Sequence, residues 1–304
     1  MTRTFRTLWQ KSSPGLFITT CVVFLAVCFI FIYPAVTSVD PLAQDIPHAF
    51  APVGTAGHLL GTDNLGRDTF VRLVVGLRTE LIVCAAGTLI AAIIGTLIGI
   101  LAAYFRGVTD LALMRVVDIF LAFPHLVFAM LIVSLYGAGD LTVVAVCAIA
   151  FFPSFARLTY GEVLSLRQAL YVESAELFGG SHWQIIRGPL LRGVGPLLLA
   201  QAFLTLAFAV GLESGLSFLG LGITPPRPSL GLMIASGQQY FTQDASQLLI
   251  PSITLVVLLV VLGYVADWVR DLLDPRGVTR RRRLRRGDAV TRTEVISLRE
   301  EVGA

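Results

Sequence analysis

The residues whose types and spacing best suggest a chemical role lie in a polar, helix-prone segment at positions 163–196, inside a chain of mostly apolar runs. Ser165 is a residue type that caps helices, and neither Gly nor Pro interrupts the chain from there through Phe178. Gly179 and Gly180 predict the end of that helix, because glycine readily adopts the left-handed backbone that follows a helix C-terminus.

A second short helix is predicted directly after the glycine pair. Ser181 and Gln184 have the spacing of a capping box, and Gly188-Pro189 predicts the end of this helix. Ser181 and His182 do not form a hydrolase pair, because adjacent residues on a helix do not face each other and no third group orients them. Two short helices joined at a glycine hinge form a knob, and a knob between membrane spans predicts docking onto a soluble partner.

Glu213 is the second chemical candidate, because it sits near the outer end of an apolar run at 193–212. An ionisable group beside a membrane span is a candidate functional residue by default. At the interfacial depth expected here, Glu213 serves either in a substrate pathway or gate or as a structural hydrogen-bond anchor.

The sequence offers no energy source of its own. It contains no Walker-type loop for ATP phosphates, and no chain of carboxylates or histidines inside its apolar runs indicates proton coupling. Its cysteines and histidines are not spaced as metal ligands, so neither a metal site nor a catalytic residue is predicted. Transport energy must therefore come from a partner, unless the protein is passive.

The composition is that of a multi-pass membrane protein. The chain has 304 residues, of which 55% are hydrophobic and 14% are charged. Soluble domains carry about 25% charged residues. Several uncharged runs reach the about 20 residues that a helix needs to cross a bilayer. Six spans are expected, with their apolar parts near 16–33, 81–104, 119–139, 141–156, 193–212 and 245–266.

Charge places the ends of these spans. Basic residues before the first span keep the N-terminus in the cytoplasm, and six crossings return the C-terminus to the same side. An arginine block at 280–286 follows the last span, where it suits an anionic inner leaflet better than nucleic acid. The expected organisation is a cytoplasmic N-terminus (1–14), a six-helix domain (15–277) with an external loop (40–78) and a cytoplasmic loop (157–192), and a basic, disordered tail (278–304).

Several motifs occur in a fixed order along residues 14–277 and resemble one family. Glu173-Ser174-Ala175 followed by Gly179 resembles the EAA loop of ABC importer permeases. GTDNLGRD (61–68), MRVVDIFLAFP (114–124), LSFLGLG after Glu213 and VRDLLDPR (269–276) resemble its dipeptide, oligopeptide and nickel branch. Ser174 stands where the family usually has Ala, and Leu230 stands where a Trp is expected.

The resemblance implies the type I ABC importer permease fold and a non-enzymatic subunit in a bacterial cytoplasmic membrane. It implies a second homologous permease subunit, two ATPase subunits or domains that hold ATP and Mg, and an extracytoplasmic substrate-binding protein. The chain itself would hold no cofactor. The 163–192 segment would couple to the ATPase, through residues that contact or shape its groove: Tyr171, Glu173, Ala175, Phe178, Gly179 and Trp183.

Peptides are the substrates that the resemblance implies first. Nickel or another small solute carried by the same machinery is the alternative. An ATP-independent channel or secondary transporter is a further alternative, which a requirement for an ATPase would exclude.

Overall fold

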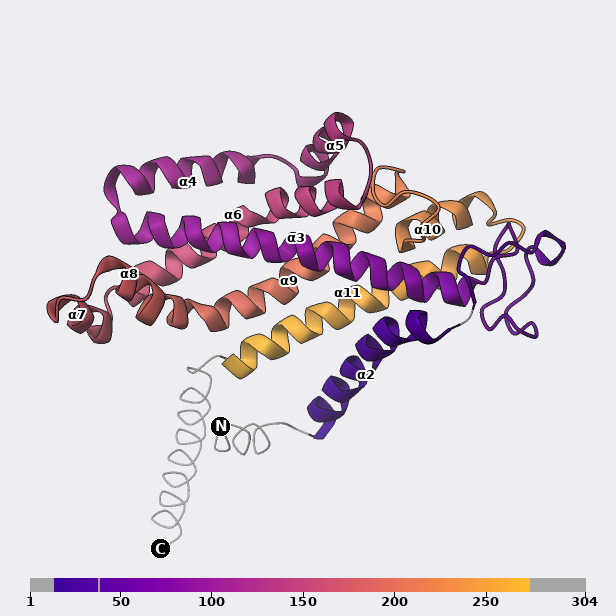
Figure 1. The fold of residues 1–304 in the computed structure, drawn as a ribbon, viewed down its shortest axis with the longest axis horizontal. Coiled ribbons are helices and arrows are strands. Elements are labelled where there is room, and N and C mark those ends of the chain that lie inside the picture. The colour runs from indigo at the N-terminus through magenta and orange to yellow at the C-terminus, as the bar shows by residue number, and fades with distance from the viewer. Residues whose placement is uncertain (1–13, 38, 274–304) are drawn as a thin grey trace, which may run out of the picture.

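The computed structural model describes residues 14–37 and 39–273, and the regular structure of this part is helical (Figure 1). The predicted tail at 278–304 and all but the last residue of the predicted N-terminal segment lie outside the described residues. The elements in chain order are α2 (Pro14–Val36), η1 (Ile46–His48), α3 (Thr69–Phe105), α4 (Gly107–Ala122), α5 (His125–Tyr136), α6 (Asp140–Leu166), α7 (Leu170–Leu177), α8 (His182–Ile185), η2 (Ile186–Leu190), α9 (Leu191–Phe218), α10 (Leu230–Gln239) and α11 (Ser246–Leu273).

Helix α3 is the central element and has 37 residues, which gives it a length of about 55 Å. It begins where the Asp68 side chain accepts a hydrogen bond from the Val71 N–H. The last ten residues of the segment assigned to the external loop, 69–78, therefore belong to α3. At its far end, α3 reaches the two short helices α7 and α8 (Figure 1).

Helix α3 packs along α6 at backbone distance, through a row of small residues. A Cβ atom on Gly95 would lie 2.3 Å from the Phe152 carbonyl oxygen. One on Gly99 would lie 2.5 Å from the Ala156 carbonyl oxygen. Glycine removes that obstacle, as in other membrane helix pairs. In sequence, Gly95 and Gly99 form a small-xxx-small pair that predicts such a packing face, and its partner is a helix of the same chain.

Four helices in the described part of the chain are long and apolar enough to cross a membrane, and α4 with α5 would make a fifth span. That pair bends by 92°. The bend lies where Phe123 adopts an extended backbone before Pro124, because a proline disfavours helix in the residue that precedes it. The third span expected at 119–139 allowed for a proline kink in its first turns, and the structure has its break at that point. Six spans and the side on which each terminus lies stay predictions.

Helix α9 does not begin at Gly193. A single π-helical turn, η2, joins α8 to α9 and contains Pro189. Proline lacks the N–H that an α-helical turn requires. A π-helical turn, which holds one extra residue, is one way in which a helix continues past such a position. The prediction that Gly188-Pro189 ends the second knob helix is therefore wrong, and the chain continues as helix to Phe218.

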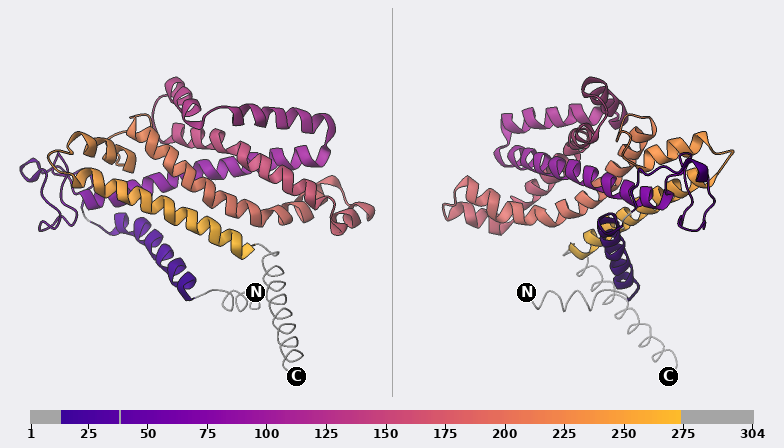
Figure 2. Two further views of the ribbon diagram at one scale, coloured as in Figure 1. Left: turned by 180° about the vertical axis from the view of Figure 1, so that it is seen from behind. Right: turned by 45° about the vertical axis from the view of Figure 1, so that its right-hand side comes forward.

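The bundle has two distinct ends (Figures 1 and 2). The knob end carries the knob, defined as residues 167–190 with α7 and α8. The loop end carries the segment 39–68 and helix α10. Helix α2 meets α3 near the loop end, where the Tyr33 ring lies 5.4 Å from the Phe70 ring. Both ends are therefore joined by α3.

The glycine seam between α3 and α6 yields a stability prediction. Gly95→Ala should destabilise the protein by about 1–3 kcal/mol, since the new Cβ meets main-chain atoms that cannot rotate away. Thermal unfolding in detergent measures the loss. The control is Gly161→Ala on α6, where no atom lies within 4 Å of the new Cβ. Equal stability of the two variants would contradict the seam.

Candidate functional site

The knob begins later than its sequence predicts. Ser165 lies in the last turn of α6, and the first knob helix, α7, starts at Leu170, so the predicted helix from Ser165 through Phe178 is wrong at its start. Its end is confirmed. Gly179 has a φ of +79°, and the Gly180 N–H donates to the Ala175 carbonyl at 3.1 Å across the turn.

The second knob helix starts as predicted. The Ser181 hydroxyl accepts from the Gln184 N–H at 3.4 Å, and the Gln184 side-chain oxygen accepts from the Ser181 N–H at 2.9 Å. This reciprocal pair is the capping box. It fixes the direction in which α8 leaves the Gly179 turn.

One face of the knob is anchored to the bundle. Val172 and Ile185 are buried in a cluster that includes Ile100 of α3. The Tyr104 hydroxyl of α3 hydrogen-bonds His182 Nδ1 at 2.7 Å. Arg167 donates to the Tyr104 carbonyl oxygen at 2.7 Å. The knob therefore cannot move as a unit without moving the end of α3.

The opposite face of the knob exposes large apolar side chains. Phe178 is 89% exposed. Tyr171 is half exposed, and Trp183 is slightly more than half exposed. The Arg187 guanidinium lies 4.5 Å from the Trp183 ring centroid. Glu173 and Gly179 are also at the surface, whereas Ala175 is partly buried and packs inward. Five of the six predicted coupling residues are thus exposed on the knob.

Sequence reasoning missed two members of this surface. Leu170 and Leu177 are 80% and 81% exposed. The spacing in the sequence could have identified them. Leu170 and Leu177 are seven residues apart, as are Tyr171 and Phe178, and residues at this spacing lie on one side of a helix. The knob therefore presents two exposed leucines as well as three aromatic residues. We call these five residues the knob face: Leu170, Tyr171, Leu177, Phe178 and Trp183.

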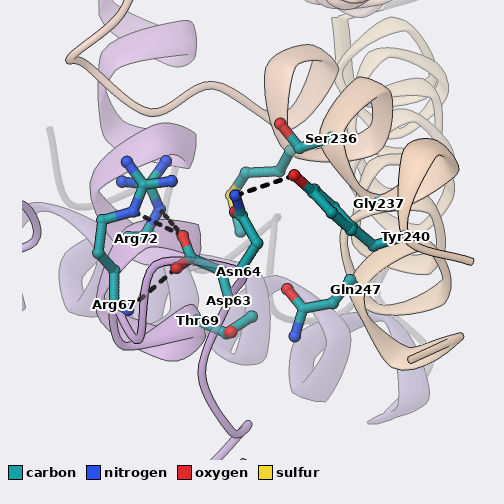
Figure 3. Close-up of a pocket in the computed structure, with 10 residues that line it drawn as sticks. Asp63, Asn64, Arg67, Thr69, Arg72, Ser236, Gly237, Tyr240 and Gln247 are labelled. Carbon is teal, nitrogen blue, oxygen red and sulfur yellow. Dashed lines mark hydrogen bonds and ion pairs between the residues drawn. The ribbon is translucent and has the colours of Figure 1, made fainter. Parts of the chain in front are cut away.

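The loop end is organised by Asp63 (Figure 3). Its carboxylate accepts from the Leu65 N–H at 2.9 Å, from the Arg67 N–H at 3.0 Å and from Arg67 Nε at 2.7 Å. Arg72 Nε of α3 lies 3.4 Å from the same carboxylate. One acidic residue therefore closes the GTDNLGRD turn and attaches it to α3. Gly66 has a φ of +73°, and a Cβ there would lie 1.8 Å from the Asp45 carbonyl oxygen.

The same turn contacts the other half of the bundle. Gln247 of α11 donates to the Thr62 carbonyl at 2.8 Å, and the Asn64 amide approaches the Tyr240 hydroxyl at 3.4 Å. Partial burial acts to raise the pKa of Asp244, but hydrogen bonds from Ser246 and Gln247 hold that pKa below its ordinary value. A cavity lined by Asn64, Tyr240 and Gln247, among others, measures about 20 Å³ (Figure 3). This volume holds about one water molecule, so the cavity is too small for a solute.

Glu213 lies inside the helix bundle. It is completely buried, and it lies against a second buried acid, Glu80 of α3, that sequence reasoning did not single out. The expectation that no chain of carboxylates or histidines couples proton flow concerns more than two residues and stays a prediction. Glu80 was missed because it directly precedes the uncharged run at 81–104. Whether Glu213 acts in a gate stays a prediction.

In the described part of the chain, no group of three His, Cys, Asp or Glu side chains could hold a metal ion. The Asp118 carboxylate pairs with Arg157 of α6. The described side chains thus offer an exposed apolar surface at the knob end and a hydrogen-bonded cluster at the loop end.

Comparison with known proteins gives one family. Residues 95–278 match the family described as "Binding-protein-dependent transport system inner membrane component". The probable D,D-dipeptide transport system permease protein DdpC of Escherichia coli (strain K12) is 32% identical over 270 residues, which are 88% of this chain and 90% of that protein. The nickel transport system permease protein NikC of the same strain is 35% identical over 240 residues, which are 79% and 86% of the two chains.

A solved structure shares the fold. It is described as inward facing conformations of the MetNI methionine ABC transporter, and it superposes with a TM-score of 0.56 at 20% identity. The match covers 67% of this chain and 97% of that one. At this identity the likeness concerns the fold alone.

The Asp63 cluster yields a second prediction. Asp63→Ala leaves the Arg67 and Arg72 guanidinium groups without their shared, largely buried carboxylate. The protein should lose about 2–3 kcal/mol of stability, less than for a fully buried pair because water screens part of the interaction. Thermal unfolding and protease cleavage within 39–68 measure it. The control is Asp45→Ala, which removes only an exposed pair with His48. Matching profiles for the two variants would refute the assignment.

Proposed function

The chain belongs to the family of binding-protein-dependent transport system inner membrane components, and from this premise we propose that it forms half of the translocation path of a peptide importer. The family places it in the inner membrane as a multi-pass, non-enzymatic permease of an ABC importer with the type I fold. ATP hydrolysis then belongs to a separate subunit. The chain needs no cofactor of its own, and an ATP-independent channel is disfavoured.

The exposed knob face, anchored from behind to α3, is the observation that carries the proposal. Aromatic residues dominate docking energies when a partner desolvates them, and Phe178 and Trp183 project from a small rigid support. A groove of the ATPase subunit is the proposed partner surface. Glu173 lies at the surface beside these residues, and Gly179 provides the turn rather than a contact.

Movement of the ATPase would reach the membrane through α3. The bond between Tyr104 and His182 and the packing of Val172 and Ile185 attach the knob to the end of that helix. A displaced knob therefore pulls on α3 and, through the glycine seam, on α6. The proposed result is alternating access, in which closure of the ATPase pair shifts the bundle between two packed states.

The proposed topology follows from this docking. The knob end lies in the cytoplasm, and the loop end lies outside, where an extracytoplasmic binding protein delivers the solute. A second homologous permease subunit completes the path, and a second ATPase subunit or domain serves it. In this topology α2 and the bent pair α4–α5 complete six spans, with both termini in the cytoplasm.

Peptides are the proposed solutes, since several relatives are named as peptide permeases. Nickel is the second candidate because the NikC protein is as similar in sequence. The buried groups of this chain do not favour a metal, since none of the described residues forms a cluster of metal ligands.

The knob face yields the third prediction. Phe178→Asp should weaken recovery of the ATPase from solubilised membranes by about 30-fold or more, the cost of losing a docking residue worth about 2 kcal/mol. Gly179→Arg and Glu173→Lys should abolish uptake, while all three variants still insert in the membrane. The matched control is Leu59→Asp, which changes an exposed apolar residue at the loop end. Full ATPase recovery with Phe178→Asp would refute docking through this face.

The solute is tested by reconstitution. The complete transporter, placed in vesicles with its binding protein and ATP, should accumulate labelled di- or oligopeptides. Nickel uptake without peptide uptake would assign the second candidate. Uptake of either solute without ATP would instead remove the chain from ATP-driven transport.

A further inference from the structure

Two acids that belong to different helices meet inside the bundle. Glu80 of α3 and Glu213 of α9 are both 0% exposed, and their carboxyl groups lie close enough to interact directly. An ionised carboxylate only accepts hydrogen bonds. A bond between two carboxyl groups therefore requires that one of them carries a proton.

The surroundings provide a limited number of donors. The Ser214 hydroxyl donates to Glu80 Oε1, and the Ser217 hydroxyl donates to Glu213 Oε1. The Leu230 backbone N–H also donates to Glu80. The Oε2 atom of each acid has no protein donor. These two oxygens are therefore left for a proton held between the acids.

No cation balances the pair. Among the described residues, neither Glu80 nor Glu213 takes part in an ion pair with Arg, Lys or His. The other titratable groups that interact with the pair are the Cys84 thiol of α3 and, beside it, the Cys147 thiol of α6. Helix α9 contributes two serines, and α10 contributes its first N–H. Two full negative charges in contact at this depth would repel each other with little screening.

We propose that Glu80 and Glu213 form a proton-binding site, in which one proton is shared between the two carboxyl groups. The pair keeps a single negative charge. Two serine hydroxyls and the Leu230 N–H stabilise that charge. Leu230 is the first residue of α10, which has ten residues and a Ser229 cap, so the positive end of its helix dipole also lies here.

The shared proton holds three elements together at the loop end. Glu80 belongs to α3 and Glu213 to α9, while α10 approaches α9 so closely that a Cβ on Gly231 would lie 2.2 Å from the Ser214 carbonyl oxygen. Without the proton, two like charges would face each other at the centre of this junction. The site is independent of which solute the chain carries, and its test does not depend on transport.

Infrared spectroscopy of the purified full chain tests the proposal. In a maltoside detergent, which has no ester carbonyl, the wild type at pH 7.5 should show the C=O band of a protonated carboxylic acid, and deuterium oxide should shift it. Each single variant, Glu80→Gln and Glu213→Gln, should lose the band. In each, the amide donates in place of the proton and the remaining acid is ionised.

Each other outcome overturns the proposal. A wild type without the band would mean that both acids are ionised and that something other than a proton balances them. A band that survives in both single variants would mean two separately protonated acids. Glu162→Gln, which changes an acid of α6 outside this pair, is the control and should leave the band unchanged. If a variant unfolds, the deuterium shift in the wild type still decides whether the proton is present.

Discussion

The contact between α3 and α6 at backbone distance is the constraint on which the other features depend. Gly87, Gly95 and Gly99 leave no side chain between these helices, so neither can rotate or slide without collision of main-chain atoms. Such a pair behaves as one rigid body. Because α3 is about 55 Å long, this rigidity extends from the Asp63 turn to the knob.

The rest of the bundle groups around a second pair, α9 with α11, to which α10 is also attached. The boundary between the two groups is partly polar. At the loop end it contains the Gln247–Thr62 hydrogen bond and the junction of Glu80 with Glu213. Polar contacts have fewer equivalent arrangements than apolar ones, so this boundary admits discrete states rather than gradual sliding.

Sequence reasoning succeeded where a structure depends on neighbouring residues and failed where it depends on distant ones. The capping box at Ser181, the turn at Gly179 and the small-residue face of α3 are local patterns, and the structure confirms them. The start of the knob was misplaced because packing of Val163 and its neighbours extends α6 past Ser165. Glu80 and Glu213 are 133 positions apart in the chain, and no local pattern could show that they meet.

The two clusters of acids at the loop end show how depth determines the way a charge is balanced. Asp63 lies in a turn that retains some contact with water, and it binds two arginines at once, so cations are in excess there. Farther along α3, no described Arg, Lys or His forms an ion pair with Glu80, and the proposed proton neutralises the charge instead. An arginine at that depth would need several further acceptors, and α9 and α10 offer donors instead. The junction between the two sets of helices therefore depends on a proton, which can bind and dissociate. The glycine seam beside it depends on shape alone.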